Sequence, residues 1–148
     1  MIAAVYYVAQ NSGASSARLV SKLSENFCME LEKKNLAELK LSFSDTAKYD
    51  MVLIIAPTYG DQELQDTMEE FLLSLNAEKT SVKYIICEIG NYYGYDDYTF
   101  GSGQIIDKYL KQFGAEKLMD VESIDSLPQI DWNAANKWID KLNKQFQQ

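Results

Sequence analysis

Short apolar runs separated by amphipathic helix patterns constrain the fold of this 148-residue chain more than any other feature. The runs Ile2–Val8, Met51–Ala56 and Val82–Ile89 are almost wholly apolar, which predicts strands covered on both faces. Segment Leu36–Phe43 alternates apolar with polar residues, as in an edge strand with one solvated face. Lys117–Val121 is expected to add a short last strand. The pattern therefore predicts a sheet whose strands are mostly buried.

Helices are predicted between and after these strands. Ser15–Lys33, Asp66–Leu75 and Ser102–Phe113 repeat apolar residues at helical spacing. Gly114 is expected to end the third of these helices, since glycine readily adopts the conformation that follows a helix. Asp131 can cap a last helix by accepting a hydrogen bond from its first amides. The side chains that this helix is expected to bury are Trp132, Ala135, Ile139, Leu142 and Phe146, with Trp138 at the border of the stripe.

The alternation of strands and helices predicts the fold class α/β. Such an order favours a parallel sheet with helices on both faces and right-handed crossovers, so we expect a doubly wound three-layer sandwich. The length is typical of one domain and no repeat or linker divides the chain, which predicts a single domain over residues 1–148. Ligands of such sheets bind beyond the carboxyl ends of the strands. The loops after the first, third and fourth strands are therefore the candidates for a site.

Composition excludes several classes of function. The chain has no histidine, so a Ser-His-Asp triad and a histidine-ligated metal site are excluded. Its net charge of -8 and its single arginine, Arg18, argue against nucleic acid as a partner. Cys28 and Cys87 are too few for a disulfide scaffold or a thiolate metal site and indicate a reducing compartment. No apolar run has transmembrane length and the N-terminus does not resemble a signal peptide, so we expect a cytoplasmic protein.

The first candidate loop, Gln10–Ser16, consists of small and polar residues and leads directly into a helix. Unpaired amides and the dipole at a helix N-terminus favour an anion, and the side chains of Asn11, Ser12, Ser15 and Ser16 could add donors. The loop has no lysine and no Gly-x-Gly-x-x-Gly spacing, so it is neither a P-loop nor a dinucleotide motif. The sequence predicts a phosphate site here. The alternative is that the serines only cap the helix.

Two further loops carry aromatic residues. In Pro57–Asp66, Tyr59 precedes Gly60, so an aromatic ring could cover a flat ligand while the glycine backbone turns freely. The alternative for this loop is a turn with a tyrosine on the surface. The third loop, Gly90–Gly101, contains four tyrosines and one phenylalanine. This composition suits stacking on a planar ring better than a core or a solvated turn.

Acidic residues are concentrated in the middle of the chain. Between Tyr49 and Asp107 there are eleven acidic residues and two basic ones, and both aromatic loops lack basic residues. We expect this stretch to form an acidic rim around the site. The alternative is a solvated acidic face that only aids solubility.

The three loops together resemble those of a short-chain flavodoxin, and the likeness runs over nearly the whole chain. The turn SGASS resembles the loop that binds the phosphate of flavin mononucleotide (FMN) in that family. PTYGDQELQD resembles the second flavin loop, and GNYYGYDDYTFG followed by IIDKYLKQFGA resembles the third loop and its helix. The resemblance implies a flavodoxin-like, five-stranded parallel sheet of order 2-1-3-4-5. Gln10 and Ala14 depart from the donors usual in the first loop, and Asn91 stands where relatives often carry an acid.

The resemblance implies FMN as the cofactor, with no catalytic residue and no metal ligand. The outer stacking tyrosine corresponds to Tyr95, with Tyr93 and Tyr98 as alternatives, and Tyr59 matches the other aromatic residue beside the ring. The carbonyl of Gly60 would accept a hydrogen bond from the reduced ring. The implied cofactor-binding residues are Gln10, Asn11, Ser12, Gly13, Ala14, Ser15, Pro57, Thr58, Tyr59, Gly60, Asp61, Gly90, Asn91, Tyr93, Tyr95 and Tyr98.

The function that the resemblance implies is that of a low-potential carrier of single electrons between redox partner proteins, without substrate turnover of its own. The acidic rim would oppose the negative charge of the fully reduced cofactor. It would also dock partners, a reductase as donor and a redox enzyme as acceptor. We expect a monomer that binds neither nucleic acid nor membrane. Two alternatives remain: a partner-specific activator similar to the ribonucleotide-reductase-activating or MioC-like relatives, and a flavin-free binding module on the same fold.

Overall fold

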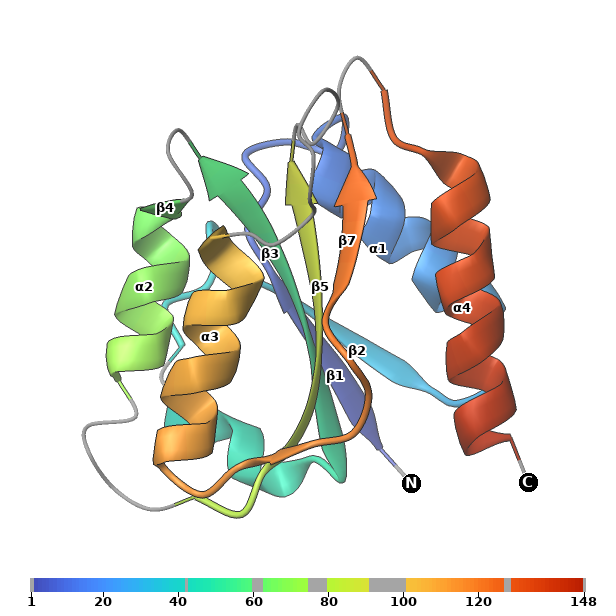
Figure 1. The fold of residues 1–148 in the computed structure, drawn as a ribbon. Helices are drawn as coiled ribbons and strands as arrows, with labels where there is room; N and C mark the ends of the chain where they lie inside the picture. Colours follow the sequence, from blue (N-terminus) through green and yellow to red (C-terminus); the bar gives the residue numbers. More distant parts are fainter. Residues whose placement is uncertain are drawn as a thin grey trace.

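A computed structural model describes residues 2–41, 43–59, 63–74, 80–90, 101–126 and 129–147 of the chain. Within these residues the strands join one sheet and helices connect them (Figure 1). The strands are β1 (Ala3–Tyr7), β2 (Leu31–Asn35), β3 (Met51–Tyr59), β4 (Glu63–Leu64), β5 (Lys83–Gly90), β6 (Glu116–Lys117) and β7 (Glu122–Asp125). The helices are α1 (Ser15–Asn26), α2 (Asp66–Leu73), α3 (Gly101–Gln112) and α4 (Trp132–Phe146), with a short 3₁₀ helix η1 (Phe43–Lys48) before β3.

The sheet follows the order β2-β1-β3-β5 and continues with β6 and β7, which pair with different parts of β5. These pairings are all parallel, whereas the two-residue strand β4 runs antiparallel to the end of β3. Because β6 and β7 together take the fifth place, the predicted order 2-1-3-4-5 and the doubly wound α/β class are confirmed. The carboxyl ends of β1, β3 and β5 lie at one edge of the sheet, which is where the predicted loops begin.

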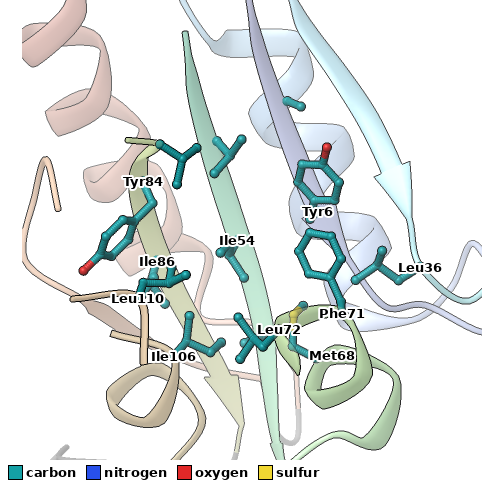
Figure 2. Packing of buried hydrophobic residues seen from close by; sticks show 14 of the residues in the cluster. Tyr6, Leu36, Ile54, Met68, Phe71, Leu72, Tyr84, Ile86, Ile106 and Leu110 are labelled. Atoms are coloured by element: carbon teal, nitrogen blue, oxygen red, sulfur yellow. The ribbon is translucent and has the colours of Figure 1, made fainter. Parts of the chain in front are cut away.

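Helices cover both faces of the sheet, with α2 and α3 on one face and α1 and α4 on the other (Figure 1). Successive side chains of a strand point to opposite faces. Ile54 on β3 packs with Met68 of α2 and Ile106 of α3 (Figure 2). Its neighbour Leu53 packs in the other cluster, with Leu19 of α1. The apolar runs are therefore buried on both faces, as predicted.

The segment between the first helix and the third strand differs from the prediction. The predicted helix Ser15–Lys33 is too long, since α1 ends at Asn26. The helical spacing of apolar residues continues past Asn26 because Phe27 and Leu31 pack against the same apolar cluster as α1. Phe27 lies in a coil and Leu31 in β2. The predicted edge strand Leu36–Phe43 is wrong because the free edge of β1 is already paired with β2.

Two strand boundaries also differ. β3 does not stop at Pro57 but continues to Tyr59. β1 pairs with β3 only as far as Ile55, so the missing N–H of the proline removes no bond to β1. The predicted strand Lys117–Val121 is wrong except at Lys117, because the chain leaves the sheet after β6 and pairs with β5 again only from Glu122, in β7.

The last helix begins as predicted, since the Asp131 side chain accepts a hydrogen bond from the Ala134 amide at 3.1 Å. Gly114 has a φ of 91°, the left-handed conformation expected after α3. Trp138 was expected at the border of the buried stripe but is 1% exposed, whereas Trp132 and Phe146 are only partly buried. The centre of α4 therefore faces the sheet, and its two ends extend past the core. In the described part of the chain, no helix has the length and apolar character needed to cross a membrane.

Candidate functional site

The predicted site residues fall at the carboxyl ends of β1, β3 and β5 and on the segments that follow these strands, and Ser15 is the first residue of α1. The structure describes residues 10–15, Pro57, Thr58 and Gly90 completely, and Tyr59 through its backbone. The predictions for the remaining residues lie outside the described part of the chain; these residues are Gly60, Asp61, Asn91, Tyr93, Tyr95 and Tyr98.

The first loop is a compact turn that ends at the N-terminus of α1. The Asn11 side-chain oxygen accepts a hydrogen bond from the Gly13 amide at 2.9 Å, and its carbonyl accepts one from the Ala14 amide at 3.2 Å. Ala14 is the N-cap of α1 and makes no side-chain capping bond, and the first turn of α1 contains no acidic residue. The first-turn amides of α1 are thus left without a side-chain cap, which is the arrangement that accepts an anion.

The serines of the first loop do not all behave as predicted. The alternative that they cap the helix is not what the structure shows, because the capping position is occupied by alanine. Ser16 was expected to offer its hydroxyl to a ligand. It instead donates a hydrogen bond back to the Val8 carbonyl at 2.6 Å and is buried. The hydroxyl of Ser16 therefore fastens α1 to the end of β1, and Ser12 and Ser15 remain as candidate donors.

Asn35, at the end of β2, holds the start of the first loop and was not predicted. Its side-chain oxygen accepts a hydrogen bond from the Ala9 amide at 3.0 Å, and its side-chain nitrogen donates to the Ala9 carbonyl at 2.9 Å. The same oxygen accepts from the Ala37 amide at 3.1 Å. The Asn35 side chain is buried. It gives the amide and the carbonyl of Ala9 the hydrogen-bond partners that the backbone of a neighbouring strand would otherwise provide.

The end of β3 is joined to the start of α3. The hydroxyls of Thr58 and Ser102 lie 2.6 Å apart, and Ser102 also donates to the Ala56 carbonyl at 3.4 Å. Ser102 is fully buried. This contact links the strand that leads into the second predicted loop with the helix that follows the third.

Glu88, near the end of β5, has a buried carboxyl on the face of the sheet that α3 covers. One oxygen accepts a hydrogen bond from the Gly103 amide of α3, and the other accepts one from the Ser123 hydroxyl of β7, each at 2.6 Å. Burial raises the pKa of Glu88 to about 7, although the two hydrogen bonds act in the opposite direction. The next residue but one, Gly90, ends β5, and its carbonyl accepts a hydrogen bond from the Ser126 amide at 2.9 Å.

The expected acidic rim can be placed only in part, because Asp61, Glu78, Asp96 and Asp97 lie outside the described part of the chain. Glu88 and Asp107 are both buried, and Asp107 accepts a hydrogen bond from Tyr84 and forms ion pairs with two lysines. Asp50 precedes β3 and so lies at the opposite edge of the sheet. Among the described acids of that stretch, the exposed ones on the side of the site are those of α2: Asp66, Glu69 and Glu70.

The described residues offer no group of three or more acidic, cysteine or histidine side chains that could hold a metal ion. Both cysteines are free; Cys28 is exposed and Cys87 is buried.

Comparisons with known proteins agree with this architecture. The family model described as flavodoxin matches residues 5–144. A solved flavodoxin from Bacillus cereus superposes with a TM-score of 0.76 at 14% identity, covering 98% of this chain and 97% of its own. A Fusobacterium nucleatum flavodoxin bound to flavin mononucleotide superposes with a TM-score of 0.74 at 12% identity, covering 99% of both chains.

A curated relative, NADPH oxidoreductase A from Dictyostelium discoideum, is 28% identical over 133 residues. The match covers 86% of this chain but only 20% of that relative, so the chain spans about a fifth of its length. A doubly wound sheet with an uncapped helix N-terminus at its carboxyl edge defines a class of anion-binding α/β proteins. Within that class, the match over residues 5–144 places this chain in the flavodoxin family, as the sequence predicted.

Proposed function

We propose that this chain binds FMN and carries single electrons at low potential between redox partner proteins. Membership of the flavodoxin family supports both the cofactor and the electron-carrier function. The observation that carries the proposal is the N-terminus of α1, which has no side-chain cap and no acid in its first turn. A phosphate dianion fits this end of the helix because the amides and the helix dipole both favour negative charge.

The residues of the site divide the work between the two ends of the cofactor. Gln10 to Ser15 hold the phosphate through backbone amides and the hydroxyls of Ser12 and Ser15. The ends of β3 and β5 and the residues after them flank the ring, with Tyr59 on one side and one of the third-loop tyrosines, Tyr95 by preference over Tyr93 and Tyr98, on the other. The one-electron chemistry is supplied by the flavin when it is bound. The protein binds it, orients it and excludes water from it.

The finer parts of the function follow from the same assignment. The chain acts as a single flavodoxin domain, a cytoplasmic monomer that transfers electrons without converting a substrate of its own. The NADPH oxidoreductase relative is a much larger protein, and this chain corresponds to only a fifth of it. We assign this chain the carrier function on its membership of the flavodoxin family.

Titration of the flavin-free chain with FMN and with riboflavin tests the proposal. We expect FMN to bind at least about 100-fold more tightly than riboflavin, because charge-assisted hydrogen bonds to the phosphate contribute about 1.5–3 kcal/mol each. Ala14→Asp places a carboxylate over the same amides. It should keep or raise the stability of the fold by capping α1, yet reduce FMN binding to the level of riboflavin. Failure of the wild-type chain to bind FMN, or equal affinity for the two flavins, would refute the phosphate assignment.

Basic partner proteins would dock on the exposed acids beside the site. We expect the association rate with a basic reductase to fall as salt is added, since complementary charges mainly accelerate encounter. Asp66→Asn on α2 should slow association at low salt, whereas Asp140→Asn on α4, an exposed aspartate on the opposite face, should slow it much less for the same change in net charge. Stopped-flow measurements over a salt series distinguish the two. Equal effects of the two substitutions would show that only net charge matters.

A further inference from the structure

The buried carboxyl of Glu88 connects several elements near the end of β5. Glu88 lies two residues before the end of β5. Its carboxylate accepts a hydrogen bond from the amide of Gly103, the third residue of α3. The hydrogen bond between them therefore joins the end of β5 to the start of α3. Its other oxygen is bonded to Ser123 on β7, so one side chain connects three elements.

The glycine at position 103 shows how close this approach is. A Cβ placed on Gly103 would lie 2.5 Å from the Glu88 carboxylate oxygen and 2.8 Å from the Val121 side chain. Only a residue without a side chain lets the backbone of α3 come this near to the carboxyl. The adjacent residue, Ser102, is bonded to Thr58 and Ala56 at the end of β3. The start of α3 is thus fixed both to β5 through Glu88 and to β3 through Ser102.

We propose that Glu88 is a positioning residue for the ring end of the cofactor site, holding the start of α3 against the ends of β3 and β5, where the predicted contacts Thr58 and Gly90 lie. This inference rests on the FMN site proposed above. Glu88 is not one of the predicted cofactor-binding residues, and it acts through its hydrogen bonds with Gly103 and Ser123.

The contacts of Glu88 are compatible with both of its charge states. The ionised carboxylate accepts from both donors. A protonated carboxyl can still accept from Gly103 with one oxygen and donate to the Ser123 hydroxyl with the other, because a serine hydroxyl can act in either direction. With a pKa of about 7, both forms exist near neutral pH. A change of pH therefore alters the charge near the end of β5 while the contacts of Glu88 persist.

The groups around Glu88 leave this charge without a described ionic partner. Ala56 of β3 pairs with it across the sheet, and Gly103 and Ser123 are uncharged. The other titratable groups on the same elements are Lys83, Tyr84, Cys87, Asp107, Lys108, Tyr109, Lys111, Glu122 and Asp125. Asp107 forms ion pairs with two lysines, and Glu122 forms one with Lys141. The pKa of Cys87 is raised first by burial and then by the charges of Glu122 and Glu88.

Two substitutions separate position from charge. Glu88→Gln keeps an oxygen for Gly103 and a polar group for Ser123 but removes the charge. Glu88→Ala removes both contacts. We expect Glu88→Ala to weaken FMN and riboflavin binding alike, by about tenfold or more, because the ring end is disturbed and the phosphate end is not. Glu88→Gln should restore the binding of both flavins. Glu122→Gln on the neighbouring strand is the matched charge control and should bind both as the wild type does.

Two further readouts do not depend on electron transfer with partners. In the flavin-free chain, hydrogen exchange of the Gly103 amide should be about tenfold faster in Glu88→Ala than in the wild type and in Glu88→Gln. In the FMN-bound chain, the midpoint potential of the wild type should change with pH across the range centred on about 7, and Glu88→Gln should lose that component. If Glu88→Ala does not fold, Ser123→Ala, which removes one of the two contacts, should give a smaller loss of both flavins.

Wild-type riboflavin affinity in Glu88→Ala, or a Glu88→Gln protein that behaves like Glu88→Ala, would overturn the positioning role. A wild-type chain that binds no flavin would instead refute the proposed function, and the exchange of the Gly103 amide would still decide whether Glu88 fixes the start of α3.

Discussion

Replacing Trp138 by alanine is expected to lower the free energy of unfolding by about 3–5 kcal/mol, the usual cost of removing a buried tryptophan side chain. Trp138 is 1% exposed and packs in the cluster between α4, α1 and the sheet. Its indole nitrogen has no hydrogen-bond partner among the residues that the structure describes. The loss should therefore come from packing and from the cavity that remains, with no contribution from a broken hydrogen bond.

Denaturant unfolding of two further variants makes this prediction specific. Trp132→Ala, at the partly buried start of the same helix, should cost clearly less, because its side chain lies at the edge of the cluster, near Arg18. Trp138→Phe should cost less than the alanine variant, since it keeps an aromatic ring in the core and removes the unpartnered N–H. Equal losses for the two tryptophan-to-alanine variants would show that α4 does not pack through its centre.

The fold could be predicted because its strands are local apolar runs. Ile54 and Ile86 lie in stretches that have no polar face, and such stretches fit only a sheet covered on both sides. The errors in the predicted helix and strand bounds arose where side chains from different elements pack in the same apolar cluster. Leu31 continues the helical spacing of α1 yet belongs to β2, because the same cluster receives both. The spacing of apolar residues predicted correctly which side chains of this segment are buried. It did not predict whether the backbone at those residues is helix, coil or strand.

The site was predicted less completely because its supporting contacts join residues far apart in the chain. The sequence predicted an anion site at the start of α1 from the small polar loop before the helix, and the structure then excluded the alternative that serines cap it. Asn35, in contrast, acts on Ala9, 26 positions earlier, and Thr58 meets Ser102 across 44 positions. Glu88 was counted among the acids of the rim, since sequence alone did not show that β5 and α3 bury it. Such roles depend on tertiary contacts that local patterns do not encode.

Asn35→Ala is expected to lower the free energy of unfolding by about 2–4 kcal/mol, because it leaves the buried amide and carbonyl of Ala9 without their partners and each costs about 1–3 kcal/mol. The same change frees the start of the first loop from β2. We therefore expect FMN affinity to fall by about tenfold or more while riboflavin affinity changes little, since only the phosphate end of the site is loosened.

Asn143→Ala provides a matched control at the other end of α1. The Asn143 side chain also bridges two backbone groups, accepting from the Cys28 amide and donating to the Asn26 carbonyl, each at 2.8 Å. Those groups are exposed, so water can replace the lost bonds and the cost should be below about 1 kcal/mol. The ratio of FMN to riboflavin affinity should then stay at its wild-type value. If Asn35→Ala also leaves that ratio unchanged, Asn35 contributes to the stability of the sheet edge alone, and the first loop keeps its phosphate-binding shape without being fastened to β2.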